Sequence, residues 1–174
     1  MRSERARHNK IIFSGTVGAG KSTAIAALSD IPPVCTEAVA SDETAALKKT
    51  TTVAMDYGLL NLPDGEKVML YGTPGQERFD FMWDILTEGG IGLVLLLDNV
   101  RPDPINDLSF FIKAFRGFIE KTGVVLGITR TDLRNVPAIE DYQRELTNHG
   151  LGNTPVFEVD AREKRDIGLL VETL

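Results

Sequence analysis

Short apolar runs alternate with longer amphipathic segments along almost the whole chain. The uniformly apolar runs at 92–97 and 124–128 predict central strands covered on both faces, and Lys10–Ser14 and Pro155–Val159 predict two further strands. Amphipathic patterns predict helices over 21–28, 79–86, 106–121, 139–149 and 163–174. This alternation predicts an α/β fold, in which a mostly parallel sheet carries helices on both faces.

Two more predicted strands, Thr52–Leu60 and Lys67–Tyr71, flank a strong turn signal. The turn contains Pro63, Asp64 and Gly65, so these strands are expected to pair as an antiparallel hairpin. One strand of the sheet is therefore predicted to run against the others. The segment Pro32–Thr51 is long, polar and rich in Thr, and we interpret it as a loop. A long loop in a compact domain is usually functional or mobile.

Composition narrows the class of protein. The 174 residues suit one domain, which we expect over 10–174 after a basic arm at 1–9. A net charge of −6 argues against a protein held broadly on nucleic acid. Cys35 is the only cysteine, so no intrachain disulfide is possible. No run approaches the ~20 apolar residues of a membrane helix, and no lipidation motif is present. We expect a cytoplasmic protein without a membrane anchor.

The segment from Gly15 to Ser22 fits the pattern G-x-x-x-x-G-K-[ST] between a predicted strand and a predicted helix. Its glycines let backbone amides turn inward around an anion, and the helix that follows points its positive end at the same place. Lys21 is expected to contact the β- and γ-phosphates during catalysis, and Ser22 to bind Mg²⁺. The motif predicts these nucleotide-binding residues: Gly15, Val17, Gly18, Ala19, Gly20, Lys21, Ser22 and Thr23.

A second motif, Tyr71-Gly72-Thr73-Pro74-Gly75-Gln76-Glu77, follows the hairpin. It resembles the D-x-x-G-Q-E switch of Ras-like small GTPases, and the segment around Thr52 resembles their first switch. The resemblance implies switch segments at 32–57 and 72–82. It also implies that Gln76 orients the attacking water, that the Gly75 amide holds the γ-phosphate and that Thr52 completes the Mg²⁺ shell. Such roles suit phosphoryl transfer, which depends mainly on positioning and charge stabilisation.

This sequence departs from the Ras-like pattern at two positions. Gly72 stands where the family has an Asp that supports Mg²⁺. Antiparallel pairing brings the start of the preceding strand beside Gly72, so we hypothesise that Asp56 substitutes; a solvated strand residue is the alternative. Val17 stands where the family often has Gly, and its bulk predicts slow intrinsic hydrolysis that a partner protein accelerates.

Two further segments resemble the guanine-reading loops of the same family. Thr129-Arg130-Thr131-Asp132 resembles N/T-K-x-D, and Asp160-Ala161-Arg162 takes the place of S-A-K. A carboxylate at Asp132 can accept hydrogen bonds from guanine N1–H and the 2-amino group, which adenine does not offer in that arrangement. The predicted base-side residues are Thr129, Arg130, Asp132, Ala161 and Arg162.

The resemblance extends over nearly the whole chain and is greatest to bacterial Ras-like GTPases similar to the gliding-motility and cell-polarity GTPases. It implies GTP and GDP as ligands, regulators of the roadblock type, and effectors. The leading hypothesis is a GTP-binding molecular switch that hydrolyses GTP to GDP and phosphate. A P-loop kinase of a small acceptor, or a nucleotide-binding module with little hydrolysis, remains an alternative. Trp83 is interpreted equally as a core residue or as a residue that partners contact.

Overall fold

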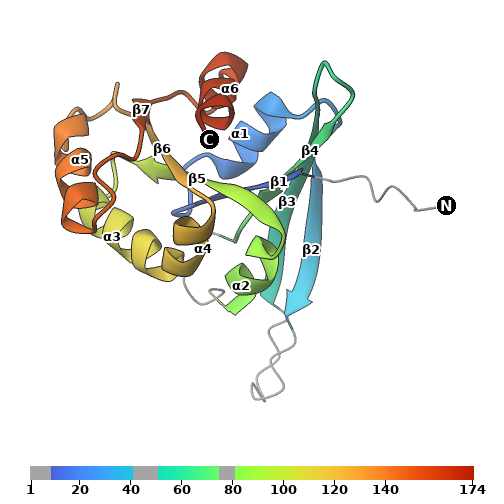
Figure 1. The fold of residues 1–174 in the computed structure, drawn as a ribbon, viewed down its shortest axis with the longest axis horizontal. Helices are drawn as coiled ribbons and strands as arrows, with labels where there is room; N and C mark the ends of the chain where they lie inside the picture. Colours follow the sequence, from blue (N-terminus) through green and yellow to red (C-terminus); the bar gives the residue numbers. More distant parts are fainter. Residues whose placement is uncertain (1–8, 41–50, 75–80) are drawn as a thin grey trace.

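A seven-stranded sheet forms the centre of the computed structural model, which describes residues 9–40, 51–74 and 81–174. The strands are β1 (Asn9–Gly15), β2 (Val34–Ala40), β3 (Thr51–Asn61), β4 (Lys67–Gly72), β5 (Gly90–Asp98), β6 (Val124–Thr129) and β7 (Val156–Glu158). The helices are α1 (Lys21–Leu28), α2 (Phe81–Thr87), α3 (Pro104–Ala114), α4 (Arg116–Lys121), α5 (Ile139–Asn148) and α6 (Lys164–Thr173). Figure 1 shows α1 and α6 on one face of the sheet and α2, α3 and α4 on the other.

The strand order is β2-β3-β4-β1-β5-β6-β7. Only β3 runs antiparallel to its neighbours, because it pairs with both β2 and β4 in the antiparallel sense while the other described pairs are parallel. The predicted α/β fold and its one antiparallel hairpin strand are therefore confirmed. This arrangement is that of a P-loop nucleotide-binding domain, with the carboxyl ends of the parallel strands at one edge.

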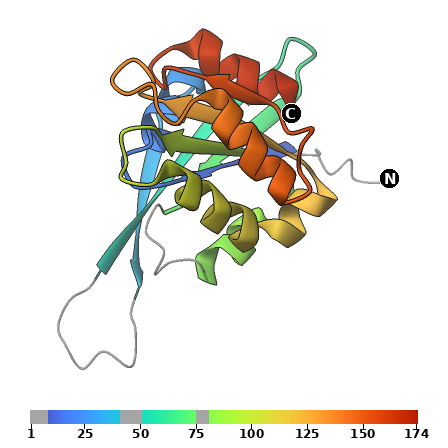
Figure 2. The ribbon, with the colours of Figure 1, turned by 90° about the vertical axis from the view of Figure 1, so that its left-hand side faces the viewer.

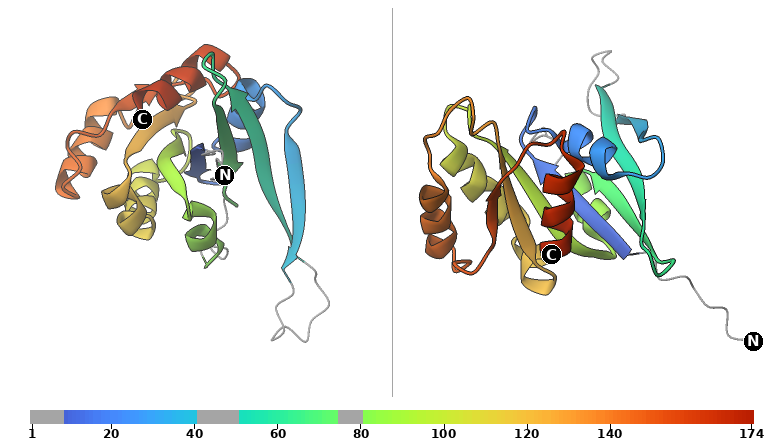
Figure 3. Two further views of the ribbon diagram at one scale, coloured as in Figure 1. Left: turned by 45° about the vertical axis from the view of Figure 1, so that its right-hand side comes forward. Right: turned by 90° about the horizontal axis from the view of Figure 1, so that it is seen from above.

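Two hydrophobic layers enclose the sheet, and the ribbon views of Figure 3 show the helices that lie on its two faces. Along β5, Val94 and Leu96 face the layer formed with α1 and α6, whereas Leu93, Leu95 and Leu97 face the layer formed with α2 to α5. All five side chains are fully buried. The uniformly apolar run thus forms a central strand covered on both faces, as its pattern predicts.

The prediction of a loop over Pro32–Thr51 is wrong for part of its length. Val34–Ala40 forms the edge strand β2, which pairs with β3 from Val34↔Tyr57 to Ala40↔Thr51. Residues 41–50 lie outside the described part of the chain. Figure 2 shows β2 and β3 extending together beyond the rest of the sheet. The strand was missed because its partner's backbone stabilises it, and backbone pairing leaves no apolar pattern in the sequence.

The predicted helix 106–121 is divided into α3 and α4. The chain leaves helical geometry at Phe115, with φ −100° and ψ 11°. The ring of Phe115 is buried and stacks on Trp83, with their centroids 4.8 Å apart. Packing of this ring against α2 accompanies a bend that the amphipathic pattern does not reveal.

Candidate nucleotide-binding site

The loop between β1 and α1 has the geometry of a phosphate cradle. Gly15, Gly18 and Gly20 have φ angles of 146°, 79° and 98°, in the region that favours glycine. A Cβ at Gly15 would lie 1.9 Å from the carbonyl oxygen of Leu96, so β5 approaches too closely for any side chain. The glycine spacing of the motif is therefore a requirement of this backbone.

Lys21 opens α1 and turns back over the loop. Its Nζ donates hydrogen bonds to the carbonyl oxygens of Gly15, at 2.9 Å, and Thr16, at 2.7 Å. Burial lowers the pKa of Lys21 to about 8, and the nearby carboxylate of Asp56 opposes the shift. The ammonium group therefore lacks full solvation, and an anion in the loop would stabilise its charged form.

Ser22, on α1, and Asp56, on β3, meet beside the carboxyl end of β4. Asp56 pairs with Gly72 in the register between β3 and β4, as the sequence predicts. The Ser22 hydroxyl donates a hydrogen bond to Asp56 Oδ2. A Cβ at Gly72 would lie 3.2 Å from Asp56 Cβ and 3.0 Å from Ile25 Cδ1. The absent side chain at Gly72 thus leaves the space that the Asp56 carboxylate occupies.

These oxygen atoms fit Mg²⁺, which prefers hydroxyl and carboxylate oxygens together with phosphate oxygens. Ser22 and Asp56 are the described residues that could hold the ion beside a nucleotide. Within residues 9–40, 51–74 and 81–174, no cluster of three or more His, Cys, Asp or Glu side chains offers a separate metal site. Thr52 lies on β3 opposite Val39, and its side chain is outside the described structure.

The loops that carry the predicted base-binding residues, at 129–132 and 160–162, contact the phosphate loop directly. Thr129 Oγ1 lies within hydrogen-bond distance of two carbonyl oxygens, 3.1 Å from Ala19 and 3.3 Å from Leu97. A Cβ at Gly20 would lie 2.8 Å from Ala161 Cβ. The loops after β6 and β7 therefore lie against the phosphate cradle, although more than a hundred residues separate them from it in the sequence.

One cavity of about 690 Å³ joins the three loops. Its walls come from the phosphate loop, the 129–133 loop and the 158–162 loop: Gly18, Ala19, Gly20, Thr23, Thr129, Arg130, Thr131, Asp132, Leu133, Glu158, Val159, Asp160, Ala161 and Arg162. Every predicted base-side residue lies in this wall. Gly15, Val17, Lys21 and Ser22 lie outside it, on the phosphate side. Val17 is 57% exposed.

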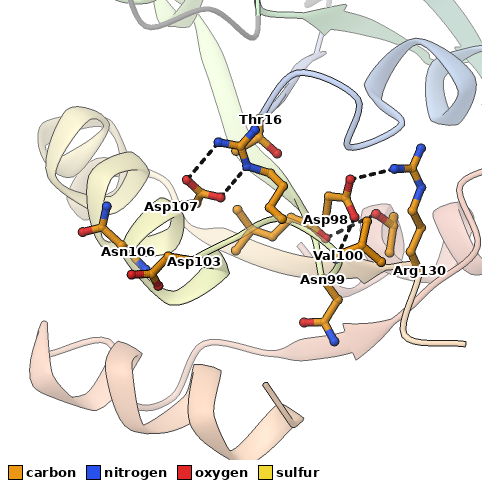
Figure 4. A network of polar contacts seen from close by, with 12 residues as sticks. Thr16, Asp98, Asn99, Val100, Asp103, Asn106, Asp107 and Arg130 are labelled. Atoms are coloured by element: carbon orange, nitrogen blue, oxygen red, sulfur yellow. Dashed lines mark hydrogen bonds and ion pairs between the residues drawn. The ribbon is translucent and has the colours of Figure 1, made fainter. Parts of the chain in front are cut away.

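Arg130 is held by an acidic residue that sequence reasoning missed. Its Nη1 lies 2.8 Å from Oδ2 of Asp98, a side chain that is only 5% exposed at the end of β5 (Figure 4). Asp98 Oδ1 also accepts a hydrogen bond from the Val100 amide at 3.0 Å. In the sequence Asp98 is only the end of an apolar run, because nothing nearby in the chain indicates that Arg130, directly after β6, lies beside it.

Arg162 is held in a similar way at the opposite loop. Its guanidinium makes two hydrogen bonds to the carboxylate of Asp160, at 2.9 and 2.7 Å. These bonds and the Arg162 backbone amide lower the pKa of Asp160 to about 2. Asp160 therefore remains ionised at neutral pH and keeps its arginine at the mouth of the cavity.

The segment predicted to form the second switch, 72–82, begins at the end of β4. Pro74 O accepts a hydrogen bond of 3.3 Å from Trp83 Nε1, and Trp83, on α2, is 2% exposed and stacks on Phe111 of α3. Trp83 is thus a core residue in this structure. Gly75 and Gln76 lie outside the described residues, so the predictions that concern them stay predictions.

No helix in the described part of the chain has the length and hydropathy needed to cross a membrane.

The fold and the site together define a P-loop nucleotide-binding protein. More particularly, the chain belongs to the family described as conserved hypothetical ATP binding proteins, whose sequence profile matches residues 33–153. That match begins beyond the phosphate loop, so the loop's motif and its geometry are independent support for the same class.

The chain is also similar to Ras-related proteins of plants. It is 23% identical to the Ras-related protein RABA2a of Arabidopsis thaliana over 171 residues, which are 95% of this chain and 72% of the plant protein. It is 22% identical to RABA1c of the same plant over 135 residues, or 75% of this chain and 57% of that protein. An uncharacterized protein of Methanocaldococcus jannaschii, MJ1339, is 33% identical over 94 residues, or 54% of this chain and 58% of the archaeal protein. The chain therefore covers less than two thirds of the last two relatives.

Proposed function

We propose that this protein is a GTP-binding molecular switch that hydrolyses GTP to GDP and phosphate. The observation that carries the proposal is the single cavity that runs from Gly18–Gly20 of the phosphate loop to Asp132 and Ala161. A guanine nucleotide has phosphates at one end and a base at the other, which suits a cavity lined by the phosphate loop on one side and by the 129–133 and 158–162 loops on the other. Similarity to Ras-related plant proteins supports the same conclusion.

The choice of GTP over ATP rests on Asp132. Its carboxylate accepts two hydrogen bonds from guanine, through N1–H and the 2-amino group, while the Ala161 amide donates to O6. Adenine reverses the donor pattern on this edge, so its binding would leave polar groups unpaired at a cost of about 1–3 kcal/mol each.

On the phosphate side, Lys21 contacts the β- and γ-phosphates and the loop amides surround them. Ser22, Asp56 and Thr52 are the proposed ligands and supports of Mg²⁺, which neutralises charge on the phosphate oxygens when bound. Gln76 orients the attacking water, and the Gly75 amide holds the γ-phosphate. Water adds to the γ-phosphorus as the bond to the β-phosphate oxygen breaks, which gives GDP and inorganic phosphate.

The state of the nucleotide is proposed to set the arrangement of two segments, 32–57 and 72–82. A γ-phosphate orders both segments, and hydrolysis releases them. Val17 stands where Ras-like proteins often have Gly, and its bulk is proposed to make intrinsic turnover slow, so that a regulator, of the roadblock type as in gliding-motility and cell-polarity GTPases, accelerates it. We place this activity in a domain over 10–174 of a cytoplasmic protein, with a basic arm at 1–9.

A second function, ATP-dependent phosphoryl transfer, is favoured by one finding: the family's own description names ATP. Asp132 distinguishes the two, because adenine lacks both the N1–H and the 2-amino group from which a carboxylate in this position would accept hydrogen bonds. Nucleotide preference therefore decides between them.

The test compares nucleotide binding and phosphate release in the purified protein. Fluorescent GDP, GTP and ADP or ATP analogues are titrated with Mg²⁺, and we expect a preference for guanine of at least about 100-fold. Release of phosphate from GTP is then followed with and without Gln76→Leu, which should lose hydrolysis while it retains binding. Thr147→Ala on α5, a residue remote from the cavity, serves as the matched control. Tighter binding of ATP than GTP would replace the proposal with the second function.

A further inference from the structure

We infer that Asp98 is a positioning residue for base recognition, which acts through Arg130 to place the carboxylate of Asp132 against the 2-amino group of guanine. The inference rests on the proposed function. It goes further because it assigns part of the selectivity to a buried residue of a neighbouring strand that does not line the cavity.

The first step is the conformation of the base-reading loop. Arg130 has φ 60°, a left-handed conformation that residues with a Cβ rarely adopt. Its carbonyl oxygen then accepts hydrogen bonds from the Leu133 and Arg134 amides, at 3.1 and 3.2 Å. This turn begins directly after β6 and determines where Asp132 lies in the cavity wall.

The second step is what holds the turn. Arg130 is the residue in the left-handed conformation, and its guanidinium is bound to Asp98 at 2.8 Å. The arginine side chain is 47% exposed, whereas that of Asp98 is only 5% exposed. The buried carboxylate therefore serves as the fixed member of the pair, and the arginine adapts to it.

The third step is the rigidity of Asp98 itself. It ends the central strand β5 and pairs in register with Thr129 on β6. The following residue, Asn99, is also held: its amide donates to Thr129 O at 3.0 Å and its side chain donates to Arg134 O at 2.6 Å. Tyr142 donates to Asn99 Oδ1 at 2.6 Å. The end of β5 and the loop after β6 are therefore connected on both sides of the turn, as Figure 4 shows for Asp98 and Arg130.

Loss of the ion pair between Asp98 and Arg130 should affect one part of the nucleotide more than the rest. Because Asp132 is the group that meets the 2-amino group, a misplaced turn should weaken recognition of that group more than binding of the phosphates. Inosine diphosphate isolates this effect, since it keeps N1–H and O6 and lacks only the 2-amino group. A general loss of folding or of phosphate binding would instead weaken GDP and inosine diphosphate equally.

The experiment measures dissociation constants of both diphosphates, with Mg²⁺, for the wild type, Asp98→Asn, Arg130→Met and the double variant. In the wild type the ratio of the dissociation constant of inosine diphosphate to that of GDP is expected to be about 10 to 100, which corresponds to one hydrogen bond to a charged acceptor. Either single substitution should reduce the ratio to about 3 or less, and the double variant should reduce it no further. Glu120→Gln alters an arginine pair away from the cavity, the exposed pair with Arg116 on α4 at 2.7 Å, and should leave the ratio unchanged.

The possible failures are distinguishable. If the wild type prefers ADP to GDP, the proposed function fails and this inference fails with it. If the wild type discriminates and both single variants discriminate equally well, only the role of Asp98 is refuted. Circular dichroism checks that each variant folds. If Asp98→Asn does not fold, Arg130→Met alone tests the inference, because the Arg130 side chain is half-exposed and its replacement should leave the fold intact.

Discussion

The hydroxyl of Ser22 donates a hydrogen bond to the carboxylate of Asp56, although the two residues lie on different elements and 34 positions apart. They meet because β3 pairs with β4 at Asp56↔Gly72 while α1 packs across both strands. A carboxylate beside the hydroxyl proposed to bind Mg²⁺ thus comes from β3, whereas the Asp of the Ras-like pattern would stand at Gly72 on β4.

Asp56→Ala is expected to weaken binding of GDP about 10- to 100-fold in Mg²⁺ and to have little effect in EDTA, because the lost group acts through the ion. Titration of a fluorescent GDP analogue under both conditions measures this. The double variant Asp56→Gly, Gly72→Asp returns a carboxylate from the neighbouring strand and should recover most of the loss. Equal affinities of the wild type and Asp56→Ala in Mg²⁺ would contradict the role.

Nucleotide affinity should fall as pH rises through the pKa of Lys21. Burial lowers this pKa to about 8 in the free protein, and phosphates must raise it again on binding. Above pH 8 binding therefore takes up a proton, and the dissociation constant of GDP should increase about tenfold per pH unit. Lys21→Arg remains protonated throughout, so the slope should be absent from whatever affinity it keeps.

The lowered pKa of Lys21 also makes the free energy of unfolding depend on pH, and this free energy rises with pH while the nucleotide affinity falls. The unfolded chain binds the Lys21 proton up to the ordinary lysine pKa of 10.5, whereas the folded chain releases it from about 8. Lys21 therefore contributes an increase in the free energy of unfolding between these two pH values. Urea denaturation of the nucleotide-free protein from pH 7.5 to 10 should show this increase in the wild type relative to Lys21→Met. Parallel curves for the two proteins would argue against the lowered pKa.

Gly20→Ala should disturb both the phosphate loop and the base side. It imposes a side chain at φ 98° and brings a Cβ within 2.8 Å of Ala161. We expect a loss of about 2–4 kcal/mol in the free energy of unfolding and at least about tenfold weaker GDP binding. Gly65→Ala is the matched control, since Gly65 has φ 88° with no atom within 4 Å of the added Cβ. Gly65→Ala should lower the free energy of unfolding only by the cost of a side chain at positive φ, and it should bind GDP as the wild type does. Equal effects of both variants would exclude a role for the Ala161 contact.

Trp83 should report the state of the second switch. It is the only tryptophan, and its indole donates to Pro74 O immediately before residues 75–80. Exchange of GDP for a non-hydrolysable GTP analogue should therefore shift its fluorescence emission. Trp83→Phe removes the signal and should cost about 1–2 kcal/mol in the free energy of unfolding, from the lost hydrogen bond and ring area. Identical emission spectra in the two nucleotide states would contradict the switch.

Most helices and strands could be predicted from local pattern because their stability depends on burial of their own apolar faces. The phosphate loop was equally predictable, since its glycines are required by backbone angles within the loop itself. The strand β2 was not, because an edge strand is stabilised by the backbone of β3 whatever its side chains are. The break at Phe115 was also hidden, since it accompanies the packing of one ring on Trp83.

The sequence by itself determined the α/β alternation and the phosphate cradle, because each of these follows from residues that are neighbours in the chain; the residues proposed to surround the base came from the resemblance to Ras-like GTPases. The sequence also led to the hypothesis for Asp56, through the antiparallel pairing of its strand, whereas only the tertiary structure revealed Asp98 beside Arg130. Asp56 reaches Ser22 through the register of β3 on β4, and Asp98 reaches Arg130 through the register of β5 on β6. A short hairpin turn restricts the register of β3 on β4, so Asp56 could be proposed from the sequence; the register of β5 on β6 is set by the packing of the sheet between its helical layers, so the place of Asp98 leaves no local signal.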